Sequence, residues 1–168
     1  MSNDFVEIKT ERLYLRTLTD NDVTLVRNFT DEFNSDGEAL EWIYWVNRNS
    51  ENEPRRVFYI WLSSTNQLIG RVYYHTKCEI DNEVEIGYGI NEEHRNNGYA
   101  TEAAKALIIY IFEKIGLETL SAIVDLDNIS SRCVIEKLGF VYKGIRTVLF
   151  GNEYRENYYY NLHYDDIE

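Results

Sequence analysis

Residues 95–101 have the types and the spacing of a phosphate-binding loop. This segment follows a strand-like run, opens a long amphipathic helix pattern and reads Arg95-Asn96-Asn97-Gly98-Tyr99-Ala100-Thr101. The first backbone N–H groups of a helix lack intrahelical partners, and the helix dipole places partial positive charge there. Gly98 has no Cβ, so a pyrophosphate can approach the backbone closely. We therefore expect the backbone N–H groups of these seven residues to bind phosphate, with the Arg95 side chain facing either the phosphates or solvent.

Two other phosphate-binding loops do not match this segment. A nucleoside-triphosphate loop requires Gly-Lys followed by Ser or Thr, but no Lys follows Gly98. A dinucleotide loop requires G-x-G-x-x-G, and although Gly87 and Gly89 have the first spacing, they lie inside the strand-like run without the third glycine. What remains is the pattern Arg/Gln-x-x-Gly-x-Gly/Ala, which Arg95, Gly98 and Ala100 provide.

A second pattern, N-I-S-S-R-C-V-I-E-K-L-G-F, spans residues 128–140. The two patterns together resemble the acetyl-CoA loop and the N-x-x-[SA]-x-x-[VL]-x-E-K-L-G-F element of the GCN5-related N-acetyltransferases (GNAT superfamily). The resemblance covers nearly the whole chain and is closest to the branch of the ribosomal-protein N-terminal (RimJ/RimL-type) and spermidine acetyltransferases. It implies acetyl-CoA as the co-substrate and a primary amine as the acceptor. Because family members often dimerise, it also suggests a homodimer.

The resemblance assigns four residues to the pantetheine arm of the cofactor. It points to the backbone of Tyr88, Gly89 and Ile90, which would pair with the arm as a strand does, and to Asn128, just past the next expected strand. Asn128 is equally suited to cap the helix that begins at Ile129, and the two roles are compatible.

Acetyl transfer from a thioester to an amine needs a base for the amine proton, donors for the oxyanion and a proton for the thiolate. Glu85 is the best candidate for the base, because strand alternation places it on one face with Gly87, near the expected thioester. The alternative is that Glu85 is a solvated strand residue. Glu83, nearer the turn, is the second choice for the base. Many family members have a Tyr as the acid where this chain has Ile135. In the ribosomal-protein branch the serine that matches Ser131 is thought to take that role, with helix packing as its alternative. Tyr88 and the aromatic cluster Tyr158-Tyr159-Tyr160 are other candidate donors.

Trp42 and Trp45 lie in the N-terminal helical region, which in the family forms one wall of the acceptor site. Their rings could bind a cationic amine by cation–π contact, or they could pack in the core. The three histidines, His75, His94 and His163, are scattered and have no metal-ligand spacing, so we expect no metal.

The elements that position these residues follow from the periodicity of the sequence. Between Gly98 and Gly116, apolar residues recur at i, i+3, i+4 and i+7, which predicts a helix ended by a glycine cap. Other helices are expected after Thr19 or Asp20, after Ser35, and over 129–138. Strands are expected over 12–17, 57–62, 67–75, 83–90, 119–125, 140–149 and 153–162, with loops at 50–56 and 79–82. We therefore predict an α/β GNAT fold, a mixed and mostly antiparallel sheet with a splayed central parallel strand pair, flanked by helices.

The composition limits the classes of protein. At 168 residues without a Pro-rich or Gly/Ser-rich linker, the chain is expected to form a single domain over 1–168. A net charge of −12 argues against a nucleic-acid partner. The sequence has no long apolar run, no signal peptide and no metal spacing of its two cysteines, which predicts a cytoplasmic protein without a membrane span. Residues 1–53 have a net charge of −7 (twelve acids, five bases) and 95–168 of −3 (eleven acids, eight bases), which suits a cationic acceptor or simply serves solubility.

The leading hypothesis is an acetyl-CoA-dependent N-acetyltransferase that acts on a protein N-terminus, a polyamine or another small cationic amine. One alternative is the same scaffold with a different acyl donor or an oxygen acceptor. The other is a non-catalytic CoA-binding module of the same fold, which Ile135 in place of the usual Tyr keeps open.

Overall fold

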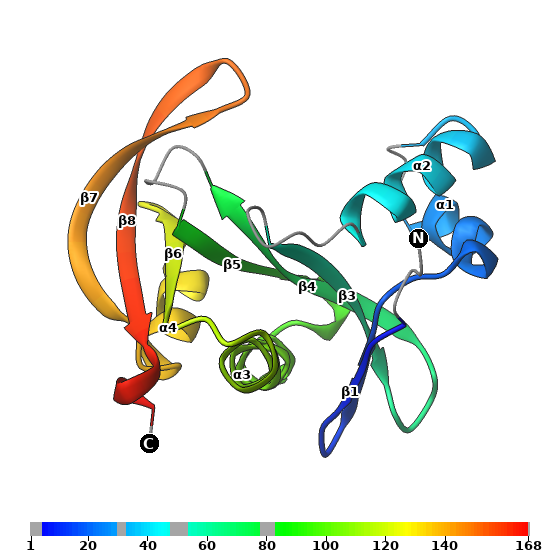
Figure 1. Ribbon diagram of the computed structural model, residues 1–168, viewed down its shortest axis with the longest axis horizontal. Helices are drawn as coiled ribbons and strands as arrows, with labels where there is room; N and C mark the ends of the chain where they lie inside the picture. The colour runs from blue at the N-terminus through cyan, green and yellow to red at the C-terminus, as the bar shows by residue number, and fades with distance from the viewer. Residues whose placement is uncertain (1–4, 30–32, 48–53, 78–82, 168) are drawn as a thin grey trace.

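A mixed sheet organises the chain, with its strands in the order β1-β2-β3-β4-β5-β6-β8-β7 (Figure 1). The computed structural model describes residues 5–29, 33–47, 54–77 and 83–167. Its strands are β1 (Glu7–Lys9), β2 (Leu13–Arg16), β3 (Arg55–Leu62), β4 (Leu68–Lys77), β5 (Glu83–Ile90), β6 (Thr119–Asp125), β7 (Val141–Phe150) and β8 (Glu153–His163). Its α-helices are α1 (Val23–Phe29), α2 (Asp36–Val46), α3 (Tyr99–Tyr110) and α4 (Ile129–Lys137).

Most of the predicted elements are present. The short strand β1 was not predicted, and β3 begins at Arg55, two residues earlier than expected. Most of the predicted loop at 50–56, and the whole of that at 79–82, lie outside the described residues. The α/β fold class, with a mostly antiparallel sheet and one parallel pair in its middle, is confirmed.

The parallel pair formed by β5 and β6 diverges after its first residues. Within the described part of the chain, the two strands pair in register at Glu85 and Ser121. β6 stays paired with β8 along its length, from Thr119 to Asp125, and β5 stays paired with β4 up to Ile90. The carboxyl-terminal half of β5 therefore has an edge that is not hydrogen-bonded to β6, which is the splay that was predicted.

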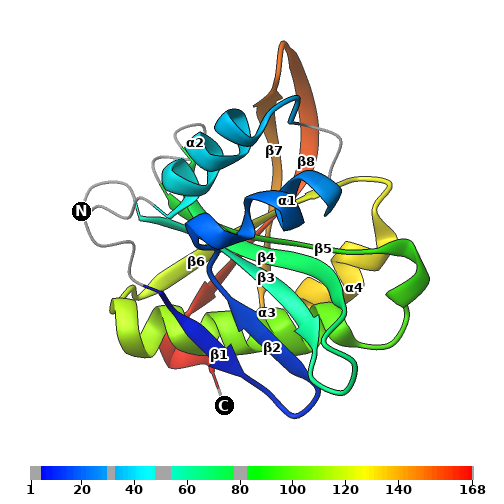
Figure 2. The ribbon, with the colours of Figure 1, turned by 90° about the vertical axis from the view of Figure 1, so that its right-hand side faces the viewer.

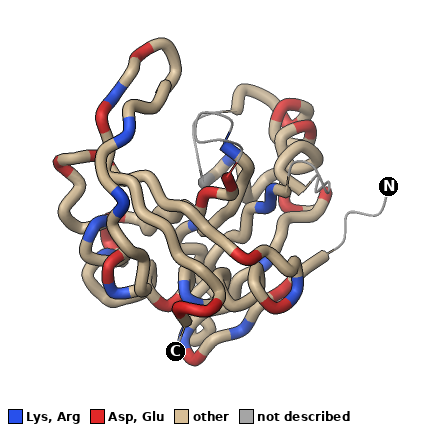
Figure 3. Tube along the Cα trace, turned by 60° about the vertical axis from the view of Figure 1, so that its left-hand side comes forward, with Lys and Arg blue, Asp and Glu red and all other residues tan. Residues whose placement is uncertain are grey.

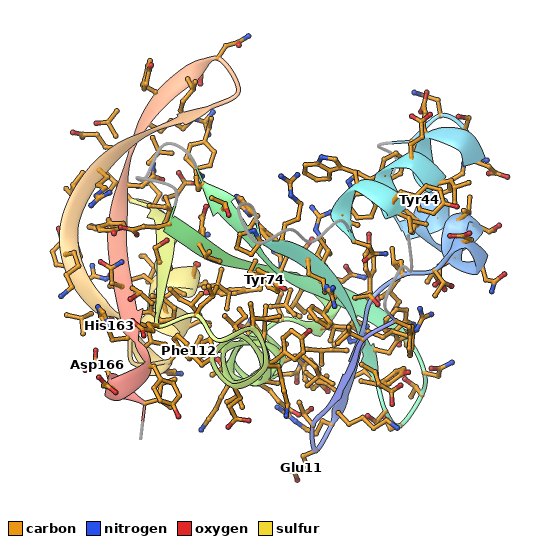
Figure 4. The ribbon with its side chains drawn as sticks, in the orientation of Figure 1. Glu11, Tyr44, Tyr74, Phe112, His163 and Asp166 are labelled. Atoms are coloured by element: carbon orange, nitrogen blue, oxygen red, sulfur yellow. The ribbon has the colours of Figure 1, made fainter. Side chains whose placement is uncertain are left out.

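Helices cover both faces of the sheet. Alanine and leucine side chains of α3, among them Ala103, Ala104 and Leu107, pack under the sheet together with Ile135 of α4. On the opposite face, Val26 of α1 and Ile43 of α2 pack on Tyr59 and other residues of β3 (Figure 2). Each fully buried side chain of this kind contributes about 1.5–3 kcal/mol by leaving water. In Figure 4, Tyr74 and Phe112 lie in the layer between the sheet and α3, while Tyr44 lies on α2 away from that layer.

The helix α3 begins and ends as its glycines predict. Gly98 and Gly116 both have positive φ, 79° in each case, a conformation that costs other residues energy. The last part of the predicted helix, Ile111–Ile115, is wound as a π-helix, and the Gly116 N–H donates to Ile111 O at 3.0 Å. The amino end of α3 is thus fixed beside the carboxyl end of β5.

Two projections rise from the same side of the sheet at opposite ends of the molecule. One is the long β7–β8 hairpin and the other is the α1–α2 pair (Figure 1). The helix α2 has three acidic residues, Asp36, Glu38 and Glu41, the first two in its amino-terminal turn, whereas α1 has none (Figure 3). Glu85, which alternates away from the α3 face, lies on the side of the sheet from which these projections rise.

Candidate active site

The loop before α3 is shaped by its own backbone and side chains. Asn96 and Gly98 both adopt positive φ, and the Asn97 Nδ2 group donates to the carbonyls of His94 at 3.1 Å and Arg95 at 3.0 Å. The first backbone hydrogen bond that closes the helix runs from Glu102 N to Gly98 O, at 3.0 Å. The N–H groups that precede Glu102 at this helix end are therefore available to a ligand, as an anion site requires.

An ion pair between Arg12, near the amino terminus, and Glu102 of α3 holds this loop in place. The Arg12 guanidinium donates from Nη1 to Asn97 O at 3.0 Å and binds Glu102 Oε2 at 2.6 Å. Thr10 Oγ1 donates to Glu102 Oε1, also at 2.6 Å. Burial works against ionisation of Glu102, but the hydrogen bonds from Thr10 and Arg12 outweigh it and hold the pKa of Glu102 below its ordinary value.

Arg95 points back toward the strand that it follows. Its Nε donates to Ile90 O at 3.0 Å, so the guanidinium lies at the end of β5 and lines a large cavity. Both outcomes that the sequence left open therefore apply in part. The side chain is exposed, and it also faces the space next to the amino end of α3.

That space, the outer cavity, has a volume of about 710 Å³. It lies between the end of β5, the amino end of α3 and one face of α4. Of the eleven residues predicted to bind cofactor, ten line it, and Asn97 supports it through the loop. The ten are Tyr88, Gly89, Ile90, Arg95, Asn96, Gly98, Tyr99, Ala100, Thr101 and Asn128. Ser131, a predicted catalytic residue, lines it too.

The charge of the outer cavity differs from that of the whole chain. Among the described residues, its lining includes Arg95, Lys137 and His94 but no Asp or Glu, although the chain has a net charge of −12. A cavity with basic and neutral walls at a helix amino end is suited to an anionic ligand.

A smaller inner cavity of about 190 Å³ lies at the splay. It shares Tyr88, Asn128 and Ser131 with the outer cavity, and its other walls include the carboxylate-bearing residues Glu85 and Asp125. The three shared residues mark the place where β5 and β6 have separated, so the site extends from one face of the sheet toward the other.

Tyr88 and Ser131 form a polar contact where the two cavities meet. The Tyr88 hydroxyl is 3.0 Å from Ser131 Oγ and 3.1 Å from Ser131 O. Burial raises the pKa of Tyr88 to about 12, and the contact with Ser131 offsets only part of that rise. Ser131 N also donates to Asn128 Oδ1 at 3.0 Å, so Asn128 does cap α4 while it lines both cavities.

Glu85 lines the inner cavity and is largely buried, with 8% of its surface exposed. Its Oε2 atom lies 3.2 Å from Lys77 Nζ and 3.6 Å from His75 Nε2, both on β4. A solvated strand position, the alternative that the sequence allowed, is therefore excluded. The neighbouring Gly87 is needed for packing, because a Cβ there would overlap the ring of Tyr73.

The two predicted acceptor tryptophans lie apart from both cavities. Trp42 packs against Phe33 and Tyr59 in the core beside α1 and α2, with ring centroids 5.5 Å and 6.3 Å away. Trp45 is 56% exposed, and the Arg55 guanidinium lies 4.7 Å from the centre of its ring. Trp45 can therefore hold a cation on its face, and in this structure the cation is the chain's own.

Some residues that line the two cavities were not among the site residues predicted from the sequence. One face of α4, formed by Ser130, Cys133, Val134 and Lys137, lines the outer cavity, and its i, i+3, i+4, i+7 spacing is a signal that could have been used. Phe150 of β7 and Asn157 of β8 line the inner cavity. Nothing local marks these two residues, because the long β7–β8 hairpin brings them there.

Two further observations concern what the described residues lack. In the part of the chain that the structure describes, no three His, Cys, Asp or Glu side chains gather as a metal site requires. None of the helices within the described ranges is long and apolar enough to cross a membrane.

Comparison with known proteins identifies the class. A family model described as an acetyltransferase (GNAT) domain matches residues 11–141, which is more than half of the chain. The protein therefore belongs to the GNAT family of acetyltransferases, as the two sequence patterns suggested.

Individual relatives agree with this family. The protein named "Uncharacterized N-acetyltransferase YnaD" from Bacillus subtilis is 29% identical over 166 residues, covering 94% of this chain and 96% of that protein. The RimL ribosomal-protein acetyltransferase in complex with coenzyme A has a TM-score of 0.76 at 16% identity and covers 96% of this chain and 99% of its own. A variant of the SpeG spermidine N-acetyltransferase from Vibrio cholerae has a TM-score of 0.69 at 21% identity, covering 92% and 95%. At these identities the two solved structures are evidence for the shared fold.

Proposed function

We propose that this protein transfers the acetyl group of acetyl-CoA to a primary amine. The observation that carries the proposal is the outer cavity, whose lining has no carboxylate in a strongly acidic chain and which meets the carboxylate-lined inner cavity at the splay. An anionic cofactor and a cationic acceptor suit these two environments. A protein N-terminus, a polyamine and another small cationic amine are the acceptor classes we propose.

The proposed cofactor site uses the residues at the end of β5 and the beginning of α3. Backbone N–H groups from Asn96 to Thr101 would bind the pyrophosphate, with the side chains of Arg95 and Lys137 adding positive charge. The backbone N–H of Arg95, which the sequence included, instead donates to Glu92 O at 3.2 Å. The edge of β5 at Tyr88, Gly89 and Ile90, which is not paired with β6, would pair with the pantetheine amides, and Asn128 would contact the same arm. Of these three residues, Ile90 already accepts a hydrogen bond from Arg95 Nε at its carbonyl oxygen. Nothing lies within 4 Å of a Cβ built on Gly89, so the face of the sheet that Gly89 shares by alternation with Glu85 and Gly87 is open at this residue.

The proposed chemistry places base and acid on opposite sides of the thioester. The acetyl ester of coenzyme A supplies an activated acyl group and a thiolate leaving group. Glu85 would take the proton of the attacking amine, and Ser131 would give its hydroxyl proton to the sulfur as the carbon–sulfur bond breaks. Tyr88, whose pKa of about 12 keeps it protonated near neutral pH, would return a proton to Ser131 across their 3.0 Å contact.

Ile135 takes no part in proton transfer, which makes the Tyr88–Ser131 contact more important. The Ile135 side chain is 1% exposed and lines the inner cavity as an apolar wall. A hydrocarbon at the usual Tyr position cannot donate a proton, so the proposal requires another donor near the sulfur. Ser131 and Tyr88 are the hydroxyl groups shared by both cavities.

The size of the inner cavity limits the part of the acceptor that enters it. Its volume of about 190 Å³ is below the range of about 300–1,000 Å³ that holds a whole drug-sized ligand. We therefore propose that only the amine-bearing end of the acceptor enters, next to Glu85 and Asp125. The rest of a peptide or polyamine would extend toward the α1–α2 side, where the exposed Trp45 is the proposed contact. Trp42, the other tryptophan that the sequence suggested, packs against Phe33 and Tyr59 instead.

The test combines cofactor binding with turnover. Thermal unfolding is expected to shift upward with coenzyme A and with acetyl-CoA, because a ligand of the native state stabilises it. Thiol release from acetyl-CoA is then measured over a panel of peptides, polyamines and small amines, with Glu85→Gln as the matched variant. Release with wild type and strong loss in Glu85→Gln would support the proposal. Binding without thiol release on any amine would instead favour a non-catalytic CoA-binding module, and no binding of coenzyme A would overturn both.

The alternative chemistries are distinguished in the same assay. Replacing acetyl-CoA with propionyl-CoA or succinyl-CoA, and the amines with alcohols of the same carbon skeleton, separates a different acyl donor or an oxygen acceptor from N-acetylation. Mass spectrometry of the product identifies the acceptor atom.

A further inference from the structure

Lys77 has a buried ammonium group directly beside the proposed base. Its side chain is 10% exposed, and Nζ lies 3.2 Å from Glu85 Oε2, whose side chain is also 10% exposed. The same nitrogen lies 4.3 Å from the centre of the Phe150 ring at the end of β7. Both Glu85 and Phe150 line the inner cavity. A cation of β4 thus joins the carboxylate of β5 to the β7–β8 hairpin.

This pair is difficult to explain by stability alone. Moving two opposite charges out of water carries a desolvation cost that their mutual attraction often fails to offset. Well-packed apolar side chains would serve the fold at least as well. The pair has a clear use if Glu85 must stay ionised in a dry cavity, because a neighbouring cation favours the charged form of a carboxylate that burial disfavours.

We propose that Lys77 is a positioning residue that keeps Glu85 ionised and fixes its Oε2 atom, so that the carboxylate can accept the amine proton. The inference rests on the proposed function, in which Glu85 is the base. It adds a residue that touches neither cofactor nor acceptor and that the chemistry above does not use.

The other groups on β4 next to Glu85 cannot replace Lys77. His75 Nε2 lies farther from Glu85 Oε2, at 3.6 Å, and its side chain is 38% exposed, so solvent screens it more. Tyr73 contributes no positive charge. Burial and then the negative charge of Glu85 raise the pKa of Tyr73, which keeps this phenol neutral.

The remaining titratable groups around the inner cavity make the cation more necessary. Asp125, at the end of β6, lines the same cavity and adds a second negative charge. On β5, Glu83 accepts a hydrogen bond from Tyr159 of β8 at 2.7 Å, and Arg146 of β7 lies over the Tyr159 ring at 3.8 Å. Lys77 is the buried lysine whose Nζ lies within ion-pair distance of Glu85, at 3.2 Å.

The proposal gives a signed prediction for the pH dependence of catalysis. Loss of the Lys77 charge raises the proton affinity of Glu85, so the acid limb of the kcat/KM profile moves to higher pH. An opposite charge at this distance typically lowers the pKa of a carboxyl group by about one to three units. Lys77→Met and Lys77→Gln are therefore expected to move the acid limb upward by about one unit or more, whereas Lys77→Arg, which keeps the charge, leaves it close to wild type.

The experiment measures kcat/KM against pH for these three variants, with the exposed Lys105→Met on α3 as the matched control. Lys77→Gln keeps a hydrogen-bond donor beside Glu85 and removes only the charge, so it serves if Lys77→Met does not fold. Folded neutral variants whose acid limb coincides with that of wild type would overturn the proposal. So would a Lys77→Arg profile shifted as far as that of Lys77→Gln.

A second readout does not depend on activity. The carboxyl ¹³C resonance of Glu85, assigned with Glu85→Gln, is titrated in wild type and in Lys77→Gln, and is expected to titrate at higher pH in the variant. If no amine supports thiol release, the proposed function fails, and this titration alone decides whether Lys77 controls the ionisation of Glu85. An unchanged titration overturns the inference even in an active enzyme.

Discussion

The hydroxyl of Tyr88 on β5 lies 3.0 Å from Ser131 Oγ on α4, across the gap that opens where β5 and β6 part. This contact joins the strand edge proposed for pantetheine to the helix whose amino-terminal cap is Asn128. It is also the place where the outer and inner cavities meet. Any acyl group held between the two cavities would lie next to these two hydroxyls.

Removing the phenol tests whether it supplies a proton. Tyr88→Phe is expected to lower kcat by about a hundredfold, since proton transfer by a positioned group contributes about 10²–10⁴, while binding of coenzyme A changes little. If the hydroxyls act in series, Ser131→Ala lowers kcat similarly, and the double variant is no worse than the slower single variant. Steady-state thiol release measures the effect on kcat, and calorimetry measures the effect on binding of coenzyme A. The exposed Tyr154→Phe is the control. Additive losses would show that the hydroxyls act independently.

Gly89 offers a test of the cofactor path that leaves the fold intact. A Cβ at this position meets nothing within 4 Å, and its φ is not positive, so Gly89→Val should unfold at a temperature close to that of wild type. The added side chain would stand on the sheet face that Gly89 shares with Glu85 and Gly87, next to the proposed path of the pantetheine arm. The Kd of coenzyme A is therefore expected to rise by about tenfold or more, as for the loss of one or two hydrogen bonds. An unchanged Kd would place the pantetheine arm elsewhere.

Lys137 is expected to contribute charge to the outer cavity. Lys137→Ala should weaken binding of coenzyme A by about two- to fivefold, the range of an exposed ion pair, and the difference should shrink as salt screens the phosphates. Lys105→Ala, an exposed lysine on α3 outside the cavity, is the matched control. Calorimetry at low and at high salt measures the Kd of coenzyme A for both variants. Equal effects of the two variants would mean that only net charge matters.

Much of the site could be predicted because its parts are local in sequence. The turn at Gly98, the α3 periodicity and the Asn128 cap each depend on residues within a few positions of one another, so spacing alone locates them. The splay of β5 and β6 came from the family resemblance, and the single register pair at Glu85 and Ser121 confirms it.

Contacts between segments that are distant in the sequence could not be predicted. Lys77 meets Glu85 because β4 and β5 are antiparallel neighbours, and Phe150 reaches them from a hairpin much later in the chain. The Arg12–Glu102 ion pair likewise joins residues ninety positions apart. No local pattern reveals which acid an arginine will meet.

The Arg12–Glu102 contact should make the stability of the phosphate loop depend on pH. The folded-state pKa of Glu102 lies below its ordinary value of 4.5. Its contribution to stability is therefore fully present above the unfolded pKa and is lost as the pH falls through the lower, folded-state pKa. Glu102→Gln should then be less stable than wild type at pH 7, and the difference in the free energy of unfolding should narrow below about pH 4.5. Because the carboxyl is partly exposed, the difference is expected to be small and sensitive to salt.

Urea unfolding of wild type and Glu102→Gln at pH 7, 5, 4 and 3 checks this dependence. Glu113→Gln, an exposed glutamate on the π-helical end of α3, is the matched control and should differ little from wild type at every pH. The same ion pair holds Asn97 O through Arg12, so coenzyme A should bind Glu102→Gln more weakly than wild type even at pH 7. A stability difference that stays constant from pH 7 to pH 3 would show that the ionised carboxylate does not hold the loop. Weaker binding with unchanged stability would instead mean that Arg12 acts only on the geometry of the loop.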